Sequence, residues 1–409
     1  MKDTKVVWII YQYASTPKTG IGGRYFYLAE ELAKQGHKVY VIASTANHLL
    51  REQPDFKEDV TFEQISGFTF VWIKMPKYVD AHSKQRALNW FLFAKRIQKL
   101  KKLIEHKPDT ILFSSPSLIP FLGAQRLANH FSARLVFEIR DIWPLTFTEI
   151  GGFSPNHPFI RFMQWIEIKA YRDSDHVLSN LKNSVEHMVK HGLQRDKFTW
   201  IANGFSLNEV NKKVPLNEVV QPQLPKNKFI IGYTGTLGFA NTLDILIEAA
   251  EILKNESDIA FVLVGHGREK EKLQDLVKEK NLNNVIFIDP ILKVQVQAML
   301  NSFDACFIGL ISDPLFKFGV SPNKLFDYFY SAKPILYAID SGDYKPVEDA
   351  KAGLQIEPEN PQALSDGILK LYRMTESERN QMGMNGRKAA LEHYEYGMLA
   401  KKLETVLFA

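Results

Sequence analysis

The sequence is poor in cysteine and has no long apolar run. Only Cys306 is a cysteine among 409 residues, so no disulfide forms within the chain, and its setting in ACFIGL predicts a buried core thiol. No apolar run approaches the ~18–20 residues that a helix needs to cross a bilayer. The start, MKDTKVVWIIYQYAS, is typical of a first strand and not of a signal peptide. We therefore expect a cytoplasmic chain without a spanning helix.

The sequence also has little net charge, since 51 Lys and Arg face 46 Asp and Glu, a balance of +5. No zinc-finger or RNP-type signature is present, so nucleic acid is not an expected partner. The basic residues are unevenly distributed along the chain, however. Eight basic residues and one acid lie between His82 and Lys107, around the aromatic run Trp90 to Phe93.

Two interpretations of this basic segment stay open. It is either a solvated amphipathic helix or a helix that lies on an anionic membrane surface. In the second case the residues expected to contact the membrane or a membrane-bound acceptor are Trp90, Phe91, Lys95, Arg96, Lys99 and Lys102.

What the sequence has in abundance is an alternation of short β-branched runs with amphipathic helical patterns. Strands are predicted at 6–10, 38–43, 68–74, 110–115, 134–139, 176–179 and 198–202 in the first half, and at 229–235, 259–265, 284–288, 305–310, 334–338 and 354–356 in the second. Such alternation is typical of parallel sheets that helices cover on both faces. The fold class is therefore α/β, with two doubly wound domains.

The seam between the domains is predicted in a polar, proline-containing stretch. We assign 1–206 to the first domain, 207–227 to a linker, 228–393 to the second domain, and 394–409 to a final helix that packs back on the first domain. Doubly wound sheets bind ligands beyond the carboxyl ends of their strands. A cleft between the domains is the expected site.

Glycine-containing loops follow the first strand of each half. Gly22 and Gly23 precede a helix and allow a backbone-lined approach to a ligand. The GxGxxG pattern of NAD-binding enzymes is not met, which argues against a dehydrogenase. In the second half, Gly235 and Gly238 permit a tight turn before a helix capped by Asn241. That turn either offers N–H groups to an anion or is a connection only.

Charged residues stand at two further strand ends. Gly265 and Gly267 are followed by Arg268, predicted to open a helix and to bind a phosphate, or else to lie on a solvated first turn. Asp141 follows Arg140 after the strand 134–139. Its carboxylate either orients or activates a hydroxyl, or forms a buried brace with Arg140.

The stretch GVSPNKLFDYFYSAKPIL predicts a helix capped by Ser321 with Pro322 at its first position. Lys324 and Asp327 then share one face. They form either a local ion pair or a site for a ligand with an anionic end and a diol end. A nucleotide-sugar has this chemistry, with its diphosphate at Lys324 and its ribose at Asp327.

With these motifs the sequence resembles the retaining GT-B glycosyltransferases of family 4 over nearly the whole chain. The resemblance rests on the first glycine loop, IANGFS, GYTGTLG, VGHG, and SPNKLFDY with SAKPIL. The SPNKLFDY form is similar to the subgroup that builds O-antigen, capsule and colanic-acid units in lipopolysaccharide and surface polysaccharide synthesis, including N-acetyl-fucosamine transferases.

The resemblance implies two Rossmann-like domains that face each other across a cleft, and transfer of a sugar with retention from a nucleoside-diphosphate donor, UDP-linked in our interpretation. It implies no cofactor and no metal, and no DxD motif argues otherwise. The implied catalytic residues are Asp141, Lys324 and Arg268. The implied donor-binding residues are Gly22, Gly23, Gly235, Thr236, Gly238, Gly265, Gly267, Ser321, Pro322, Asn323, Leu325 and Asp327.

The implied acceptor is a polyprenyl-diphosphate-linked saccharide at the inner face of the cytoplasmic membrane, so a peripheral location is expected. The sequence departs from the family at two places. The first of two family glutamates falls on Gly319 and the second on Asp327, and a usual Arg and Lys are replaced by Thr236 and Asn241. The rival hypotheses are a nucleotide-sugar epimerase and a non-catalytic membrane scaffold.

Overall fold

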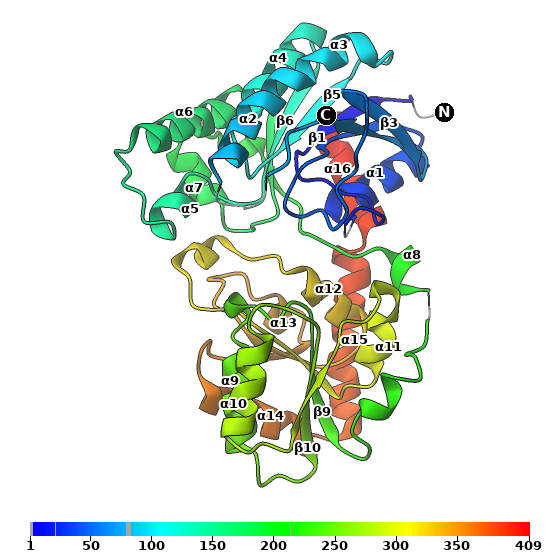
Figure 1. The fold of residues 1–409 in the computed structure, drawn as a ribbon, viewed down its shortest axis with the longest axis vertical. Helices are drawn as coiled ribbons and strands as arrows, with labels where there is room; N and C mark the ends of the chain where they lie inside the picture. The colour runs from blue at the N-terminus through cyan, green and yellow to red at the C-terminus, as the bar shows by residue number, and fades with distance from the viewer. Residues whose placement is uncertain (1–2, 21, 79–82, 213) are drawn as a thin grey trace. The chain divides into compact units, whose positions relative to one another are not determined.

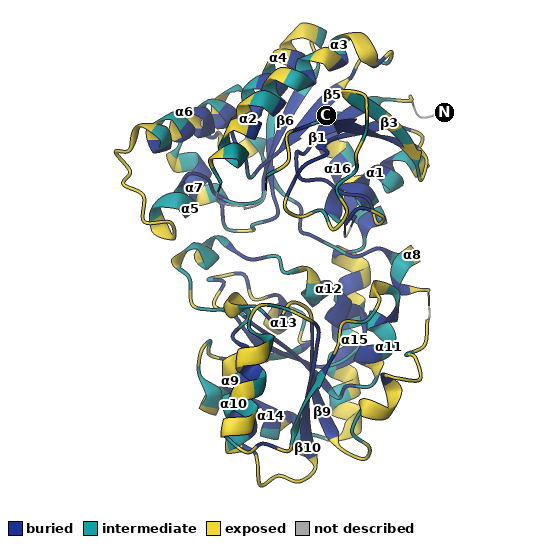
Figure 2. Cartoon of the chain, in the orientation of Figure 1, coloured by how far each residue is buried: buried dark blue, intermediate teal, exposed yellow. Residues whose placement is uncertain are grey.

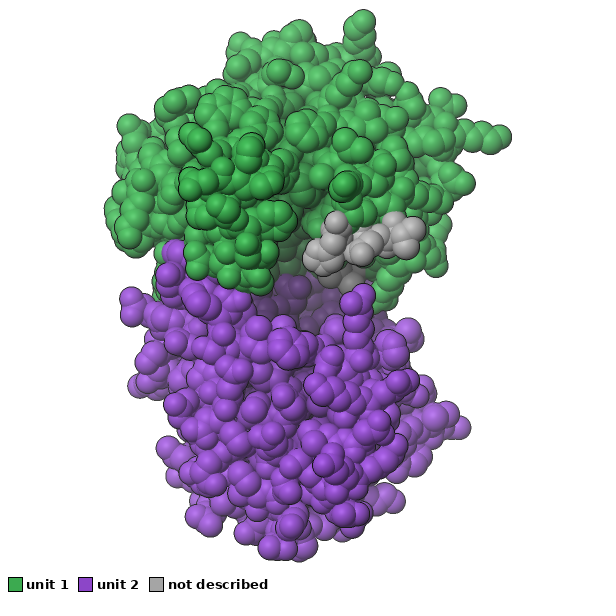
Figure 3. Space-filling view, turned by 60° about the vertical axis from the view of Figure 1, so that its left-hand side comes forward, with its two compact units in different colours: residues 1–203, 396–409 green, residues 204–395 purple. Residues whose placement is uncertain are grey.

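The computed structural model describes residues 3–20, 22–78, 83–212 and 214–409, as Figure 1 shows. Most strands are buried, whereas the helices have exposed outer faces (Figure 2). The chain divides into two compact units, coloured separately in Figure 3. Unit 1 comprises residues 1–203 and 396–409, and unit 2 comprises residues 204–395. The segment 207–227, expected to be a linker, is part of unit 2.

Unit 1 is built on an eight-stranded sheet in the order β3-β4-β2-β1-β5-β6-β7-β8. All neighbours pair in parallel except β3, which is antiparallel to β4. The strands are β1 Val6–Ile10, β2 Lys38–Ser44, β3 Val60–Ile65, β4 Phe68–Ile73, β5 Thr110–Ser114, β6 Arg134–Ile139, β7 His176–Ser179 and β8 Phe198–Trp200.

The helices of unit 1 include the end of the chain. They are α1 Arg24–Lys34, α2 Lys84–Arg96, α3 Leu100–Leu103, α4 Phe121–Phe131, α5 Leu145–Glu149, α6 Pro158–Asp173, α7 Val185–Lys190 and α16 Tyr396–Leu407. Helix α16 packs against α1 in the same apolar core, and Tyr396 stacks on Tyr27 at a centroid distance of 5.1 Å (Figure 1). The last helix is therefore an integral part of the first unit's core.

Unit 2 is built on a six-stranded, all-parallel sheet in the order β11-β10-β9-β12-β13-β14. Its strands are β9 Phe229–Thr234, β10 Ile259–Val264, β11 Val285–Ile288, β12 Ala305–Gly309, β13 Ile335–Ala338 and β14 Gly353–Gln355. Its helices are α8 Leu207–Val210, α9 Leu243–Ile252, α10 Lys270–Glu279, α11 Val296–Asn301, α12 Asn323–Tyr330, α13 Pro346–Asp349, α14 Pro361–Arg373 and α15 Glu376–His393.

The prediction of two doubly wound α/β domains is confirmed, and every predicted strand range coincides with a strand to within two residues at each end. The strand that the sequence analysis missed is β3. It is an edge strand with several exposed or half-exposed residues, and it joins β4 through a turn at Ser66 and Gly67, both with positive φ. An edge strand needs no continuous apolar run, so its pattern is weak.

No helix among the described residues is both long and apolar enough to cross a membrane. Cys306 is a free thiol that is completely buried in β12, as predicted. Burial raises the pKa of this thiol to about 12, so it stays protonated at neutral pH.

A buried ion pair fixes the loop that precedes α1 to the carboxyl edge of the first sheet. Nη2 of Arg24, the first residue of α1, lies 2.9 Å from Oε1 of Glu138 in β6, and each side chain is 1% exposed. Arg24 also donates to the carbonyls of Ile201 and Ala202, just beyond β8. One guanidinium therefore links the start of α1 to two strand ends.

Replacing Arg24 with Met should destabilise the protein strongly, because the carboxylate of Glu138 would stay buried without its counter-ion. Breaking a buried pair on one side costs about 3–5 kcal/mol. Urea unfolding monitored by circular dichroism measures this change. Lys34→Met is the matched control, since Lys34 is 45% exposed and its pairs with Glu30 and Glu31 lie at the surface. Equal midpoints for the two variants would contradict the assignment.

Candidate functional site

The site in unit 2 is built around the start of α12. This helix begins at Asn323, with Pro322 as its N-cap residue and no side-chain cap. The prediction that Ser321 is the cap is therefore wrong by one residue, because Pro322 has φ −71° and ψ 125° and is still extended. Leu325 is fully buried in the core, so its side chain has a packing role.

Lys324 points from α12 into the turn that follows β9. Its Nζ donates to the hydroxyl of Tyr233 at 2.7 Å and to Oδ1 of Asn241 at 2.8 Å. It also lies 4.3 Å from the centroid of the Tyr233 ring. These are neutral groups, and the carboxylate of Asp327 faces a different lysine. A partly buried ammonium with neutral partners is suited to an anionic ligand.

The surroundings of Lys324 change its protonation. Desolvation by burial lowers the pKa of its ammonium to about 7. The phenol of Tyr233 donates to the carbonyl of Thr236 at 2.7 Å, and burial raises its pKa. A diphosphate next to Lys324 would favour the charged form and raise its pKa again.

Asn241 holds the turn in place and was predicted to cap a helix. That prediction is wrong, because α9 begins at Leu243 after Thr242, which adopts the left-handed conformation with φ 46°. Asn241 instead donates from Nδ2 to the carbonyl of Thr236 at 3.1 Å and accepts from Lys324. It therefore connects the turn to the lysine.

The loops after β9 and β10 lie against each other through their backbones. A Cβ on Gly265 would lie 1.9 Å from the backbone oxygen of Gly235, and one on Gly267 would lie 2.0 Å from that of Leu237. Leu237 donates to the carbonyl of His266 at 3.0 Å and accepts from the N–H of Glu269 at 3.1 Å. These glycines are needed for close packing, whatever they contact in a complex.

Arg268 lies in the exposed turn before α10, which begins two residues later at Lys270. It was predicted to open that helix, and in this detail the prediction is wrong. Within the described ranges its guanidinium has no ion-pair partner. The backbone contacts of Leu237 place this turn beside the turn that receives Lys324. The structure therefore brings Gly235, Thr236, Lys324 and the Arg268 turn together.

Asp327 is 8% exposed and is already paired. Its Oδ2 lies 2.5 Å from Nζ of Lys293, which belongs to the short 3-10 helix Lys293–Gln295 after β11. Lys293 is half-exposed, so the pair has an open side. Lys324 and Asp327 therefore point to different neighbours, and the local ion pair that the sequence allowed is not the arrangement found.

Gly319, which stands where the family has a glutamate, is buried and has φ 94°. This left-handed region favours glycine, so a glutamate would be strained there. A separate groove of unit 2 lies between α9 and α10, and its lining includes six acidic residues, Asp244, Glu248, Glu269, Glu271, Asp275 and Glu279. An acidic lining repels a diphosphate, so this groove is not the donor site.

In unit 1, Asp141 and Arg140 do not form the brace that the sequence allowed. Asp141 accepts from Nε1 of Trp143 at 2.9 Å and from the hydroxyl of Thr146 at 2.8 Å. The guanidinium of Arg140 lies over the rings of Tyr11 and Tyr25 instead. The carboxylate of Asp141 therefore stands at the carboxyl end of β6, oriented by its own loop.

Gly22 and Gly23 both have positive φ, 70° and 77°, and Gly23 is the N-cap residue of α1. They form the bend that leads into α1, directly before Arg24. Their conformation is one that glycine adopts without strain.

The basic aromatic segment contains both core residues and exposed residues, so only part of it fits the membrane interpretation. Trp90 is only 4% exposed and donates to the hydroxyl of Tyr13 at 2.9 Å, so it is a core residue. Lys99 pairs with Asp59 at 2.5 Å, and Arg96 donates to the carbonyl of Lys74. Ala81 and His82 lie outside the described residues. Phe91, Lys95 and Lys102 are exposed as the membrane interpretation requires.

Sequence reasoning missed the roles of Tyr233, Lys293 and the side chain of Asn241 in this site. Tyr233 was taken as an ordinary strand residue, and Lys293 lies in a segment without a motif. The one available signal was that Tyr233 stands next to the last residue of β9, where a doubly wound sheet binds ligands.

Comparison with known proteins assigns both halves of the chain. The family model described as Glycosyltransferase Family 4 matches residues 19–209, and the model described as Glycosyl transferases group 1 matches residues 217–389. The putative colanic acid biosynthesis glycosyl transferase WcaI of Escherichia coli (strain K12) is 25% identical over 288 residues, which cover 68% of this chain and 70% of WcaI.

Solved structures agree on the fold. Sucrose-phosphate synthase from Thermosynechococcus elongatus superposes with a TM-score of 0.73 at 15% identity, covering 98% of each chain. Anabaena HepE, solved in complex with UDP and glucose, superposes with a TM-score of 0.66 at 16% identity, covering 98% of this chain and 99% of HepE. At these identities the likeness establishes the fold.

The low pKa of Lys324 predicts proton uptake on binding. A nucleoside diphosphate near Lys324 should raise that pKa, so at pH 8 binding should take up a fraction of a proton approaching one. Calorimetry in HEPES and in Tris, which differ in ionisation enthalpy, measures the uptake. Lys324→Met should abolish it, whereas Lys272→Met, at an exposed lysine of α10, should not.

The lowered pKa of Lys324 also predicts how the stability of the ligand-free protein depends on pH. Because the pKa is about 7 when folded and 10.5 when unfolded, the unfolded chain holds more protons between these values. Wild-type stability relative to Lys324→Met should therefore rise as the pH increases from 7 towards 10.5. A constant difference across that window would contradict the lowered pKa.

Proposed function

Because the chain is a family 4 glycosyltransferase with the GT-B fold, we propose that it transfers a sugar from a UDP-linked donor, with retention, to a lipid-linked saccharide. The observation that carries the donor part is Lys324, an ammonium with neutral partners at the edge of the second unit's sheet. HepE, which has the same fold, was solved with UDP, and this supports a uridine nucleotide as the leaving group.

We assign the diphosphate to Lys324, Arg268 and the exposed turn of Gly235 and Thr236. The usual cationic clamp of the family is absent here, since its positions are Thr236 and Asn241. Lys324 and Arg268 then carry the charge that grows on the departing diphosphate, which is where a positive group accelerates the reaction. Asn241 contributes by holding Lys324 in place.

Asp327 remains the proposed partner of the ribose hydroxyls. Its pairing with Lys293 does not consume both oxygens, because the ion pair involves Oδ2. A carboxylate accepts several hydrogen bonds, so Oδ1 is the atom to receive a diol. Lys293 then fixes the orientation of the carboxylate.

Asp141 is the proposed first-unit residue that contacts the acceptor hydroxyl or the donor sugar. Both its oxygens are engaged by Trp143 and Thr146, and this orients them at the end of β6. In the retaining mechanism that we propose, the leaving phosphate accepts the proton of the acceptor hydroxyl on the same face. Asp141 then positions groups and is not itself the base.

The proposed acceptor class is supported by a relative and not by the site. WcaI is described as a putative glycosyl transferase of colanic acid biosynthesis, which is a surface polysaccharide. This supports a polyprenyl-diphosphate-linked acceptor and a role in O-antigen, capsule or lipopolysaccharide assembly. We propose that the transfer needs no metal, since Lys324 and Arg268 would compensate the charge of the leaving diphosphate.

The donor assignment is tested by thermal shift against a panel of UDP-, GDP- and dTDP-sugars, followed by chromatographic detection of released nucleoside diphosphate with a lipid-linked acceptor. The proposal predicts a rise in melting temperature with UDP-sugars. Because the proposed transfer proceeds with retention, the product should have the same anomeric configuration as the donor. NMR of the anomeric proton measures this.

Single variants Lys324→Ala and Arg268→Ala should lower turnover by at least about tenfold, as expected for loss of a charged hydrogen bond worth about 1.5–3 kcal/mol. Nucleotide affinity should fall less. Lys272→Ala is the control for a surface lysine of the same unit. Wild-type turnover in both variants, or no response to any nucleotide, would reject the donor site and favour the scaffold.

We further propose that unit 1 approaches the inner membrane surface through α2 and α6. Leu88 and Phe91 of α2 are 60% and 47% exposed, and Trp165 of α6 is 52% exposed. Phe162 connects them, stacked on Phe91 at 6.3 Å and on Trp165 at 6.0 Å. The exposed aromatic strip therefore runs along two helices, and Trp90, which was expected to contact the membrane, is not part of it.

This proposal predicts binding to vesicles that contain anionic lipid, with a decrease as salt rises, since each cation near such a surface contributes about 1 kcal/mol. The double variant Phe91→Ser, Trp165→Ser should lose vesicle co-sedimentation but keep activity on a short soluble acceptor. Met384→Ser, at an exposed methionine of unit 2, is the control. Equal sedimentation with neutral and anionic vesicles would contradict the proposal.

A further inference from the structure

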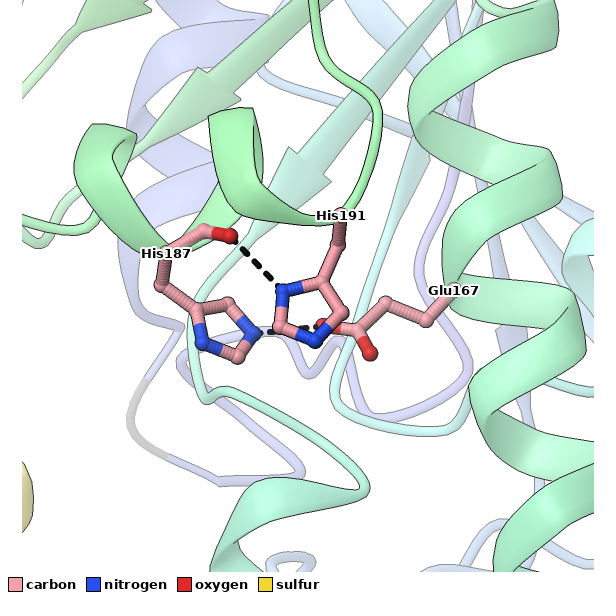
Figure 4. Close-up of side chains that lie close together, drawn as sticks. All are labelled: Glu167, His187 and His191. Atoms are coloured by element: carbon pink, nitrogen blue, oxygen red, sulfur yellow. Dashed lines mark hydrogen bonds and ion pairs between the residues drawn. The ribbon is translucent and has the colours of Figure 1, made fainter.

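Two histidines and a glutamate of unit 1 form a cluster that the transfer reaction does not use. Glu167 lies in the middle of α6, His187 lies in α7, and His191 follows directly after α7. Their ligand-type atoms all lie within 4.8 Å of one another, and Figure 4 shows the two imidazole rings side by side with the carboxylate reaching towards them. Glu167 is 1% exposed and His187 is 8% exposed, whereas His191 is partly exposed.

The carboxylate of Glu167 is only partly satisfied by protein donors. Nε2 of His187 lies 2.9 Å from Oε1, and the hydroxyl of Tyr171 donates to the same oxygen at 2.9 Å. Within the described part of the chain, Oε2 receives no hydrogen bond. Oε2 is therefore the carboxylate oxygen that remains available to a cation.

The orientation of His191 is the second observation. Its Nδ1 lies 2.8 Å from the carbonyl oxygen of His187, and a carbonyl only accepts. The proton therefore sits on Nδ1, and Nε2 of the neutral ring carries a lone pair. Histidines that bind metals almost always donate their other N–H to a carboxylate, a backbone carbonyl or water, which fixes the tautomer in this way.

The spacing of the two rings adds a third argument. The centroids of His187 and His191 are 4.2 Å apart with an interplanar angle of 31°. At this spacing one ring nitrogen of each histidine and one carboxylate oxygen of Glu167 lie within 4.8 Å of one another. Neutral imidazole nitrogens and a carboxylate oxygen are the donor set that zinc binds, with a fourth position for water.

We propose that Glu167, His187 and His191 bind a zinc-like divalent cation that fastens α6 to α7. On binding, the His187 ring changes tautomer by proton exchange with water: Nε2 loses the proton that it shares with Glu167, Nδ1 carries one instead, and the lone pair of Nε2 faces the ion. The partly exposed ring of His191 provides the open side from which the ion enters and at which water completes the coordination. The site is structural and independent of the donor site, which lies in the other unit.

The test uses the full-length protein stripped with a chelator and dialysed. Isothermal titration with ZnCl₂ should give one site per chain, and Co²⁺ should give visible d–d absorption bands that zinc displaces. Zinc should also raise the melting temperature, because a ligand that binds only the folded state stabilises it.

His191→Asn should lower zinc affinity by more than about tenfold, since even outer-shell partners of metal ligands contribute 10–100-fold. Its partial exposure makes it the variant most tolerant of change, and His130→Asn, at an exposed histidine of α4, is the control. Glu167→Gln provides a second variant of the same volume. The absence of a zinc site in the wild-type protein, or equal affinity in His191→Asn and His130→Asn, would overturn the proposal.

Discussion

The backbones of the loops after β9 and β10 lie in direct contact, and the arrangement of the second unit's site depends on that contact. Gly265 and Gly267 have no Cβ, and any other residue would collide with the backbone oxygens of Gly235 and Leu237. The contact fixes the turn through Thr236, whose carbonyl receives both Tyr233 and Asn241. These two side chains in turn receive Lys324. Close backbone packing therefore determines where the cation stands.

The charges of this site are divided between two separate pairs of neighbours. Lys324 has neutral acceptors and a lowered pKa, whereas Asp327 has Lys293 as its counter-ion. In the proposed donor site, this division leaves Lys324 available to an anion although the family's Arg and Lys are replaced by Thr236 and Asn241. Because the neighbours of Lys324 are neutral, an anionic ligand beside it would favour the protonated amine and then interact with the full positive charge in a partly desolvated setting.

In unit 1, the charged groups described above are engaged by residues of their own loops and strands. Arg24 and Glu138 compensate each other in the core, and Asp141 is oriented by Trp143 and Thr146. In the cluster of Glu167, His187 and His191, Oε2 of Glu167 receives no hydrogen bond within the described residues. The exposed aromatic strip of α2 and α6 is likewise a surface feature with no structural role in the core.

The sequence by itself determined the strands, the α/β class and the loops that carry the site. Buried parallel strands appear in the sequence as continuous apolar runs, and the glycines that follow them can be identified directly. Local patterns were therefore enough to predict β1, β9 and the turn at Gly235. The same reasoning missed β3, because an edge strand that is exposed on one side leaves a weak pattern.

Only the tertiary structure decided which side chains meet. Lys324 and Asp327 share a helix face in sequence, yet one reaches Asn241 and the other Lys293, which come from distant loops. Trp90 and Phe91 are neighbours in sequence, yet one is in the core and the other at the surface, because the packing of α2 sets the rotation of the helix. Contacts across the sheet depend on which strands become neighbours, and no local period encodes that order.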